Sequence, residues 1–167
     1  MKLPTIDQLV LKLGLQAHPE GGYYKETYRS QGKIPASALP GFTGERNHAT
    51  AIYYLLGQGD FSAFHRIRQD ETWHYYMGAP LLLHEIDPRG NYRAQWIGPD
   101  IASGQLPQYV VAAGHWFAAE PAPGTDYCLM GCTVAPGFDF ADFELAEAQE
   151  LITSFPQHSE LIRRLTR

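Results

Sequence analysis

The sequence has little of several features that would place the chain in a specialised class. Cysteine occurs only twice in 167 residues, and charged residues make up 19% of the chain, below the roughly 25% usual in globular proteins. There is no run of lysine or arginine, and the formal net charge is −5. We therefore expect neither nucleic acid nor a negatively charged membrane surface as a partner. No apolar run is long enough to span a bilayer.

The two cysteines, Cys128 and Cys132, do not predict a disulfide or a zinc site. Residues four apart in a strand point to one face but lie about 13 Å apart, beyond the reach of a disulfide. A zinc site would need further thiol or imidazole ligands at finger-like spacing. Buried free thiols in a reducing compartment are expected. Polar residues also interrupt the apolar residues of 1–15, so this segment does not resemble a signal peptide and we expect a cytoplasmic protein.

Short β-rich runs separated by turn signals dominate the middle of the chain. They cover residues 50–56, 61–67, 72–77, 81–86, 92–97, 109–119 and 127–134. Closely spaced strands with tight turns predict an antiparallel sandwich or barrel. The aromatic content of 13% suits a compact core. Because no linker or internal repeat divides the chain, residues 1–167 are expected to form a single domain.

Helical patterns flank these strands. Thr5 and Gln8 fit a capping box, and apolar residues at helical spacing follow until Gly14, which predicts a short N-terminal helix. Residues 144–155 predict a helix near the C-terminus. A second one is expected after Pro156, because proline suits the first turn of a helix.

The segment between the N-terminal helix and the first central strand has two parts. Residues 23–29 alternate with period two, which places Tyr24, Glu26 and Tyr28 on one face of a strand. If that face is covered, Glu26 is a candidate ligand-binding carboxylate. The alternative is a solvated glutamate on an outer strand. Residues 31–48 are rich in glycine and proline and are expected to form a loop.

Residues 59–78, GDFSAFHRIRQDETWHYYMG, set histidines and carboxylates in a segment patterned as a β-hairpin. The first cupin motif is glycine, five residues, histidine, one residue, histidine, three or four residues, glutamate, six residues, glycine. The segment resembles it through Gly59, His65, Ile67, Glu71 and Gly78, with isoleucine in place of the second histidine. The second cupin motif, anchored on Gly114, keeps only that glycine and has Phe117 at the histidine position.

The chain as a whole is similar to one uncharacterised cupin subfamily, DUF985 or cupin 5. The stretches HPEGGYYKETYRS, TAIYYLL, FSAFHR, DETWHYY, GQLPQYVV, GHWFAAEP and GCTVAPGFDFADFELA follow one another in that family's order. The resemblance implies a mainly β fold, the cupin double-stranded β-helix (a jelly-roll-like antiparallel barrel), with short N-terminal and C-terminal helices. It also implies a pocket in the barrel. It further implies a homodimer in which the edge strand at 22–30 adds to the partner's sheet.

Cupin metals usually take three histidines and a glutamate. In this chain the resemblance leaves His65 and Glu71 at ligand positions, with Ile67 and Phe117 at the other two. Two protein ligands are fewer than a catalytic zinc or iron site uses. We therefore expect no metal cofactor.

The alternative is a weak divalent metal site in which His74 or His115 joins His65 and Glu71 as a ligand. His115 lies one side-chain pair from Phe117, about 6.7 Å along the strand. His74 has the strand parity opposite to that of Glu71, so both could face inward only across a bulge. Both histidines are interpreted as hydrogen-bonded structural residues.

His65 is the candidate general base or acid. An imidazole in the barrel can take a proton near pH 7, and Glu71 could orient the ring and stabilise its charged form. Tyr24 is the candidate group that returns the proton. The arrangement also resembles sugar-nucleotide epimerases of the cupin superfamily, which keep this histidine without a metal set. A core histidine with satisfied hydrogen bonds is the alternative.

Aromatic side chains complete the candidate site. Trp73, Trp116 and Phe117 are expected to wall the pocket with ligand-binding contacts, although aromatic residues in a small barrel are often plain core. Arg66 and Arg68 have the opposite parity to His65 and are expected to pair with carboxylates on the outer face.

These observations predict a small-molecule-binding cupin. We expect a metal-independent isomerase or epimerase acting on a small polar, sugar-like or carbonyl substrate. A metal-dependent dioxygenase and a non-catalytic binding barrel are the alternatives, because a fold resemblance alone supplies no substrate.

Overall fold

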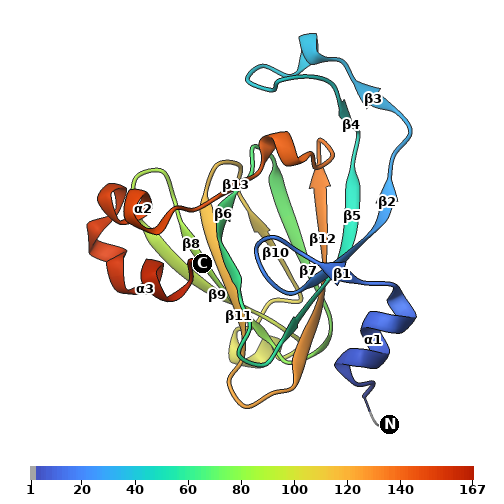
Figure 1. Ribbon diagram of the computed structural model, residues 1–167, viewed down its shortest axis with the longest axis vertical. Coiled ribbons are helices and arrows are strands. Elements are labelled where there is room, and N and C mark those ends of the chain that lie inside the picture. Colours follow the sequence, from blue (N-terminus) through green and yellow to red (C-terminus); the bar gives the residue numbers. More distant parts are fainter. Residues whose placement is uncertain (1–2) are drawn as a thin grey trace.

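Two antiparallel β-sheets form the body of the protein in the computed structural model, which describes residues 3–167 (Figure 1). The first sheet has the strand order β1 (Gln16–Ala17), β2 (Tyr23–Arg29), β5 (Thr50–Gly57), β12 (Tyr127–Ala135), β7 (Asp70–Gly78) and β10 (Gln108–Val111). The second has the order β13 (Glu144–Leu145), β6 (Ser62–Arg66), β11 (Trp116–Pro121), β8 (Leu81–Ile86) and β9 (Tyr92–Ile97). The predicted mainly β, antiparallel barrel architecture is confirmed.

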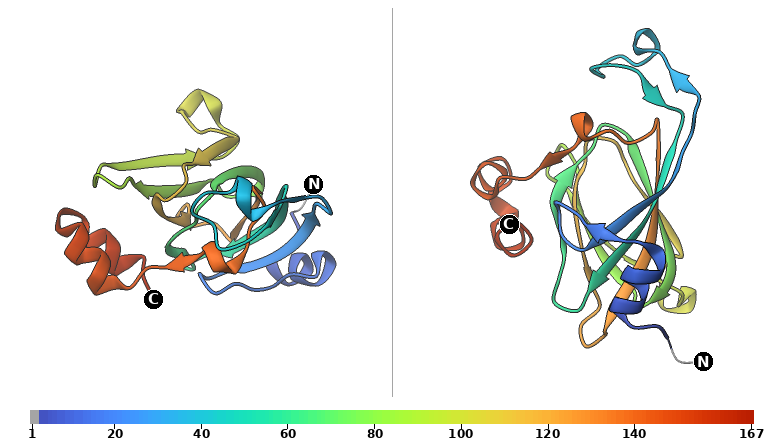
Figure 2. Two further views of the ribbon diagram at one scale, coloured as in Figure 1. Left: turned by 90° about the horizontal axis from the view of Figure 1, so that it is seen from above. Right: turned by 45° about the vertical axis from the view of Figure 1, so that its right-hand side comes forward.

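Short helices stand at both ends of the chain, as predicted. In α1 (Ile6–Leu13) Thr5 and Gln8 form the capping box, and Gly14 ends the helix in the left-handed conformation with φ 64°. The C-terminal helices are α2 (Ala148–Ser154) and α3 (Ser159–Arg164), joined by the 3₁₀ turn η4 (Pro156–His158). They lie against the outside of the second sheet (Figure 2). Within residues 3–167 no helix is long and apolar enough to cross a membrane.

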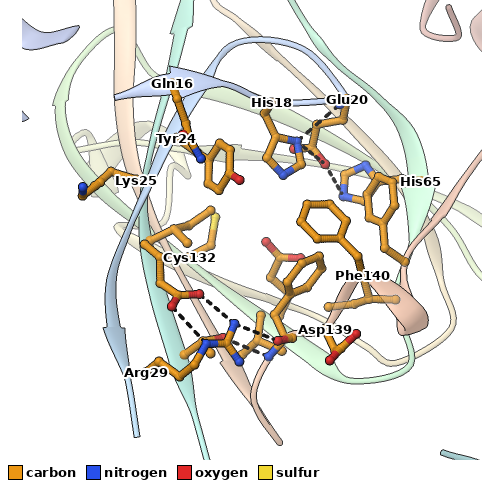
Figure 3. A pocket seen from close by; sticks show the side chains of 18 residues that line it. Gln16, His18, Glu20, Tyr24, Lys25, Arg29, His65, Cys132, Asp139 and Phe140 are labelled. Atoms are coloured by element: carbon orange, nitrogen blue, oxygen red, sulfur yellow. Dashed lines mark hydrogen bonds and ion pairs between the residues drawn. The ribbon is translucent and has the colours of Figure 1, made fainter. Parts of the chain in front are cut away.

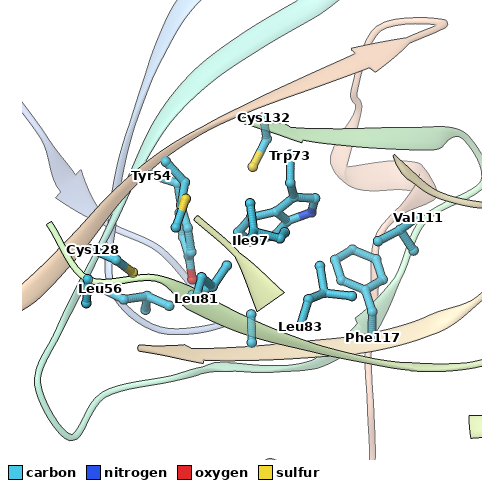
Figure 4. Packing of buried hydrophobic residues seen from close by; sticks show 13 residues of the cluster. Tyr54, Leu56, Trp73, Leu81, Leu83, Ile97, Val111, Phe117, Cys128 and Cys132 are labelled. Carbon is cyan, nitrogen blue, oxygen red and sulfur yellow. The ribbon is translucent and has the colours of Figure 1, made fainter. Parts of the chain in front are cut away.

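The main core lies between the two sheets (Figure 4). Its largest fully buried members include Tyr54, Trp73 and Phe117. Cys128 and Cys132 are part of the same cluster, and both are buried free thiols, which confirms that prediction. Burial raises the pKa of the Cys128 thiol to about 12, so it stays protonated.

Residues 31–48 are more ordered than the expected loop. The strands β3 (Lys33–Ile34) and β4 (Arg46–Asn47) pair to make a hairpin arm, which stands away from the barrel (Figures 1 and 2). Arg46 ties this arm to Asp142 in the 3₁₀ helix η3 (Phe140–Asp142) by two hydrogen bonds of 2.7 Å. These paired strands are too short to give a period-two signal, and the sequence prediction missed them.

A β-bulge in β2 changes which side chains reach the barrel interior. Glu26 pairs with Ile52, whereas Tyr28 pairs with the next residue, Ala51, so Thr27 is the extra residue. One extra residue reverses the alternation of faces beyond it. The prediction that Tyr28 shares a face with Glu26 is therefore wrong, and Arg29 takes that side instead.

Candidate functional site

A cavity of about 500 Å³ opens at the end of the barrel where β2, β5, β6, β7 and β12 meet (Figure 3). One wall is apolar and consists largely of Phe138, Phe140 and Phe143, which follow β12 in the chain. Polar side chains from residues 16–29 form the facing wall. Such a mostly apolar concavity with a few convergent polar groups is typical of small-molecule sites.

The structure brings four of the predicted site residues together. His65, Glu71, Tyr24 and Glu26 all line this cavity. They come from β6, β7 and β2, so the barrel assembles them from distant parts of the chain. The polar members of the candidate set therefore share one cavity, and their catalytic and binding roles stay predictions.

The three predicted aromatic wall residues do not line the cavity. Trp73 and Phe117 are each 1% exposed and belong to the core between the sheets. Trp116 has the opposite strand parity to Phe117, so it packs outside the barrel under the C-terminal helices. There it lies 4.5 Å from the guanidinium of Arg66. Short β-rich runs with many aromatic residues do not reveal which rings face a cavity and which fill the core.

His65 is held at both ring nitrogens. Nδ1 lies 2.7 Å from the carbonyl oxygen of Ala63, which can only accept, so Nδ1 carries a hydrogen. Nε2 lies 3.0 Å from Oε2 of Glu20. The carboxyl group that orients the ring is therefore Glu20 and not Glu71, as the sequence had suggested.

Glu20 and His18 lie in the turn between β1 and β2 and were not among the site residues predicted from the sequence. This turn approaches the barrel closely at a glycine pair, Gly21 and Gly22, both with positive φ. A Cβ on Gly21 would collide with the carbonyl of Phe61, so only glycine allows this approach. The sequence signal that could have identified this turn is the glycine pair preceded by His18 and Glu20.

Burial favours the neutral forms of both Glu20 and His65. Their side chains are 7% and 3% exposed. Burial raises the pKa of Glu20 and lowers the pKa of His65 to about 4, because a dry environment disfavours both charged forms. The neutral pair is thus favoured, with the Glu20 carboxyl donating to Nε2. Ser62 donates to the other oxygen of Glu20 at 2.9 Å.

His18 presents a hydrogen-bond donor to the cavity. The backbone N–H of Glu20 donates to its Nδ1 at 3.3 Å, so the neutral ring carries its hydrogen on Nε2. Burial lowers the pKa of His18, which favours this neutral form. The ring points into the cavity, against Tyr24 at a centroid distance of 4.6 Å (Figure 3).

Glu71 is a second buried acid on the cavity wall. Burial raises the pKa of Glu71 to about 8. It is therefore mainly protonated at neutral pH, and a carboxyl group with such a pKa can donate or accept a proton there.

We expect Glu71 to make the stability of the protein pH-dependent. Its pKa is higher in the folded chain than the ordinary value of 4.5, so the folded state binds more protons between these values. Its stabilising contribution is complete below about pH 4.5 and is lost as pH rises to about 8, with a slope near 1.4 kcal/mol per pH unit. Denaturant unfolding of the wild type and Glu71→Gln across this range measures it. A stability difference that does not change with pH would contradict the shift.

The mouth of the cavity carries an ion pair. Arg29 donates to both carboxylate oxygens of Glu26, at 3.0 and 2.7 Å. Arg29 also donates to Asn47 at 2.9 Å and to the carbonyl of Phe138 at 3.1 Å. Glu26 is therefore a half-exposed member of a fixed network at the rim.

The remaining histidine predictions are confirmed. His74 hydrogen-bonds Thr133 and Gln108 on the outer face of the first sheet. His115 contacts the carboxylate of Glu85. Both are structural residues outside the cavity. The predicted outer-face pairing of the arginines also holds, since Arg66 lies 2.7 Å from Glu144 and Arg68 lies 3.9 Å from Asp142.

The family model described as the Cupin superfamily (DUF985), Cupin_5, matches residues 7–146. The chain belongs to this family. A hypothetical protein from Leishmania major has a similar structure, with a TM-score of 0.88 and 35% identity over 98% of this chain and 99% of that one. The uncharacterized protein YML079W of Saccharomyces cerevisiae is 30% identical over 87% of this DUF985 chain and 77% of its own length.

A more distant likeness supports the cupin fold alone. Oxalate decarboxylase from Bacillus subtilis aligns with 89% of this chain at a TM-score of 0.55 and 13% identity. The chain covers 36% of that protein, which has been described with Mn(II) centres.

The residues of this DUF985 protein do not fit the usual cupin metal set. Ile67 and Phe117 supply hydrocarbon at two ligand positions, and both nitrogens of His65 are engaged. Within residues 3–167 no group of three or more histidine, cysteine, aspartate or glutamate side chains is arranged to hold a metal.

Proposed function

We propose that this cupin is a metal-independent acid–base enzyme of the isomerase or epimerase type, acting on a small polar, carbonyl-bearing substrate. The observation that carries the proposal is the buried Glu20–His65 pair at 3.0 Å on the wall of the cavity. A carboxyl–imidazole pair with one shared proton can accept a second proton when the imidazolium that forms is balanced by negative charge developing on the substrate.

The proton transfer would run through Glu20. Its own proton moves to Nε2 of His65 while its carboxylate takes a proton from the carbon next to the substrate carbonyl. The C–H bonding electrons form the enolate, whose negative charge is balanced by the imidazolium of His65. The Nε2–H of His18 is placed to donate to the enolate oxygen, and such a donor stabilises charge as it develops.

The return of the proton would come from another side of the cavity. Glu71, protonated near neutral pH, and the phenol of Tyr24 are the two donors on the wall. Delivery to the opposite face of the carbon inverts its configuration. In a 2-hydroxy substrate, the hydroxyl proton can pass to the former carbonyl oxygen, and delivery of the returning proton to the former carbonyl carbon then gives an isomer. The group that donated is then restored by the proton held on the Glu20–His65 pair.

Solvent exchange tests this proposal directly. Pools of aldoses, ketoses and 2-keto acids are incubated with the protein in D₂O, and loss of the proton signal next to the carbonyl is followed by NMR. We expect exchange for at least one compound class. If native mass spectrometry shows a co-purifying small molecule that exchanges no proton, the protein is a non-catalytic binding barrel.

Metal analysis tests the dioxygenase alternative. We expect protein purified without a nickel column to carry well under one equivalent of transition metal, because the ligand positions hold Ile67 and Phe117. A chelator should then barely change the melting temperature. Stoichiometric iron, zinc or nickel that is lost in His65→Ala would promote the metal-dependent reading.

We also propose a two-fold homodimer formed through β2. One edge of β2 pairs with β5, and the other pairs with β1 only at Tyr23 and Tyr24. Exposed strand edges are usually covered or paired, and residues 25–29 offer such an edge. Light scattering at micromolar concentration should give twice the 18.7 kDa mass of one chain. The mass of a single chain would contradict the dimer.

A further inference from the structure

A second depression adjoins the catalytic cavity. It encloses about 660 Å³ and shares Ile67 and Phe143 with the cavity. Four segments that are distant in sequence surround it: residues 40–42 of the arm, residues 66–68 at and just after the end of β6, the turn at 113–114 and the segment at 141–144. We call it the arginine cleft, because Arg66 and Arg68 line it.

The charges of the arginine cleft leave one cation in excess. Asp142 is matched by the buried guanidinium of Arg46, and Glu144 is matched by Arg66. Arg68 donates to the neutral carbonyl of Gly41 at 2.9 Å and lies 3.9 Å from the already paired Asp142. Its side chain is 52% exposed. A guanidinium in this state has donors left for a further acceptor.

The cleft also has room beside this guanidinium. A Cβ built on Gly41 or Gly114 would meet no atom within 4 Å. The ring of Phe143 lies between the two hollows, with its centroid 5.3 Å from that of His65. The two hollows therefore adjoin at the side chains of Phe143 and Ile67, which line both.

We propose that the arginine cleft binds an anionic group, phosphate or carboxylate, of the same molecule whose carbonyl end occupies the cavity. This inference rests on the proposed function and narrows its substrate to an anionic carbonyl compound. Arginine suits the role because its planar fork matches the oxygens of phosphate and carboxylate.

A matched pair of sugars tests the inference. Calorimetric titrations with ribose and ribose 5-phosphate differ only in the anionic group. We expect the phosphate ester to bind roughly 10–100-fold more tightly than the sugar, as for a charge-assisted hydrogen bond. Arg68→Gln should remove most of this difference. Arg89→Gln, in an exposed turn outside the cleft, should leave it unchanged.

Inorganic phosphate and acetate, titrated alone, distinguish the two anionic groups. Binding that weakens in Arg68→Gln and not in Arg89→Gln supports the cleft. Equal binding of both sugars, no binding of either anion at millimolar concentration, or equal affinities in both variants would overturn it. If one of these negative results is found and the wild type still exchanges a proton of an uncharged carbonyl compound, the proposed function stands and only the anionic subsite is ruled out.

Discussion

Glu20→Gln is expected to lower the turnover of proton exchange by about 10²–10⁴-fold, the usual cost of losing a proton-transfer group. The amide can still donate to Nε2 of His65 and accept from Ser62, which Glu20 contacts at 3.0 and 2.9 Å. It cannot pass a proton onward. Folding should therefore be nearly unchanged, and turnover and melting temperature are measured on the same preparation.

His65→Asn should cause a loss of similar size, because it removes the other half of the pair. His74→Asn is the matched control, since His74 lies on the outer face of the same barrel, hydrogen-bonded to Thr133 and Gln108. Activity within a few-fold of wild type in Glu20→Gln would rule out the pair as the catalyst. If Glu20→Gln stays folded and active while His65→Asn unfolds, His65 is a core histidine.

Arg46→Ala is expected to destabilise the protein by about 3–5 kcal/mol, as for removal of one partner from a buried ion pair. The side chains of Arg46 and Asp142 are 5% and 0% exposed, and the substitution leaves the Asp142 charge with Gln69 as its buried partner. Denaturant unfolding measures the loss. Limited proteolysis should also show faster cleavage in the arm at 31–48, which this pair fastens to η3.

Lys33→Ala provides the comparison within the same arm. Lys33 pairs with Glu45, and both side chains are more than half exposed, so its removal should cost less than about 1 kcal/mol. Equal losses in the two variants would show that Arg46 contributes no more than a surface pair. Arg46→Met with Asp142→Leu should recover part of the lost stability, because apolar groups leave no buried charge unpaired.

The fold was predictable because its signals are local. Alternation of apolar residues, turn residues between runs and the Thr5–Gln8 capping box each depend on neighbours within a few positions. Among the runs that were predicted as strands, residues 109–119 were the exception. It divides into β10 and β11 at the turn that contains Gly114.

The site was predictable only in part, because its decisive contacts are long-range. Ser62 and Glu20 are 42 residues apart in the chain, and no periodic pattern links a turn at one position to a strand at another. Glu71 was assigned to orient His65 because it shares a motif with it. The turn before β2 instead brings the carboxyl group of Glu20 to the ring of His65. Burial there raises the pKa of Glu20.

The extra residue in β2 has a consequence for comparing this chain with its relatives. At Thr27 the side of the strand that faces the cavity changes from even to odd positions. A relative that lacks Thr27 would have a regular strand in which its arginine, two positions after its glutamate, still faces the cavity. The extra residue therefore leaves Glu26 and Arg29, three positions apart in the chain, on the same side of the strand, where they pair at the rim, and an alignment with such a relative has its gap at Thr27.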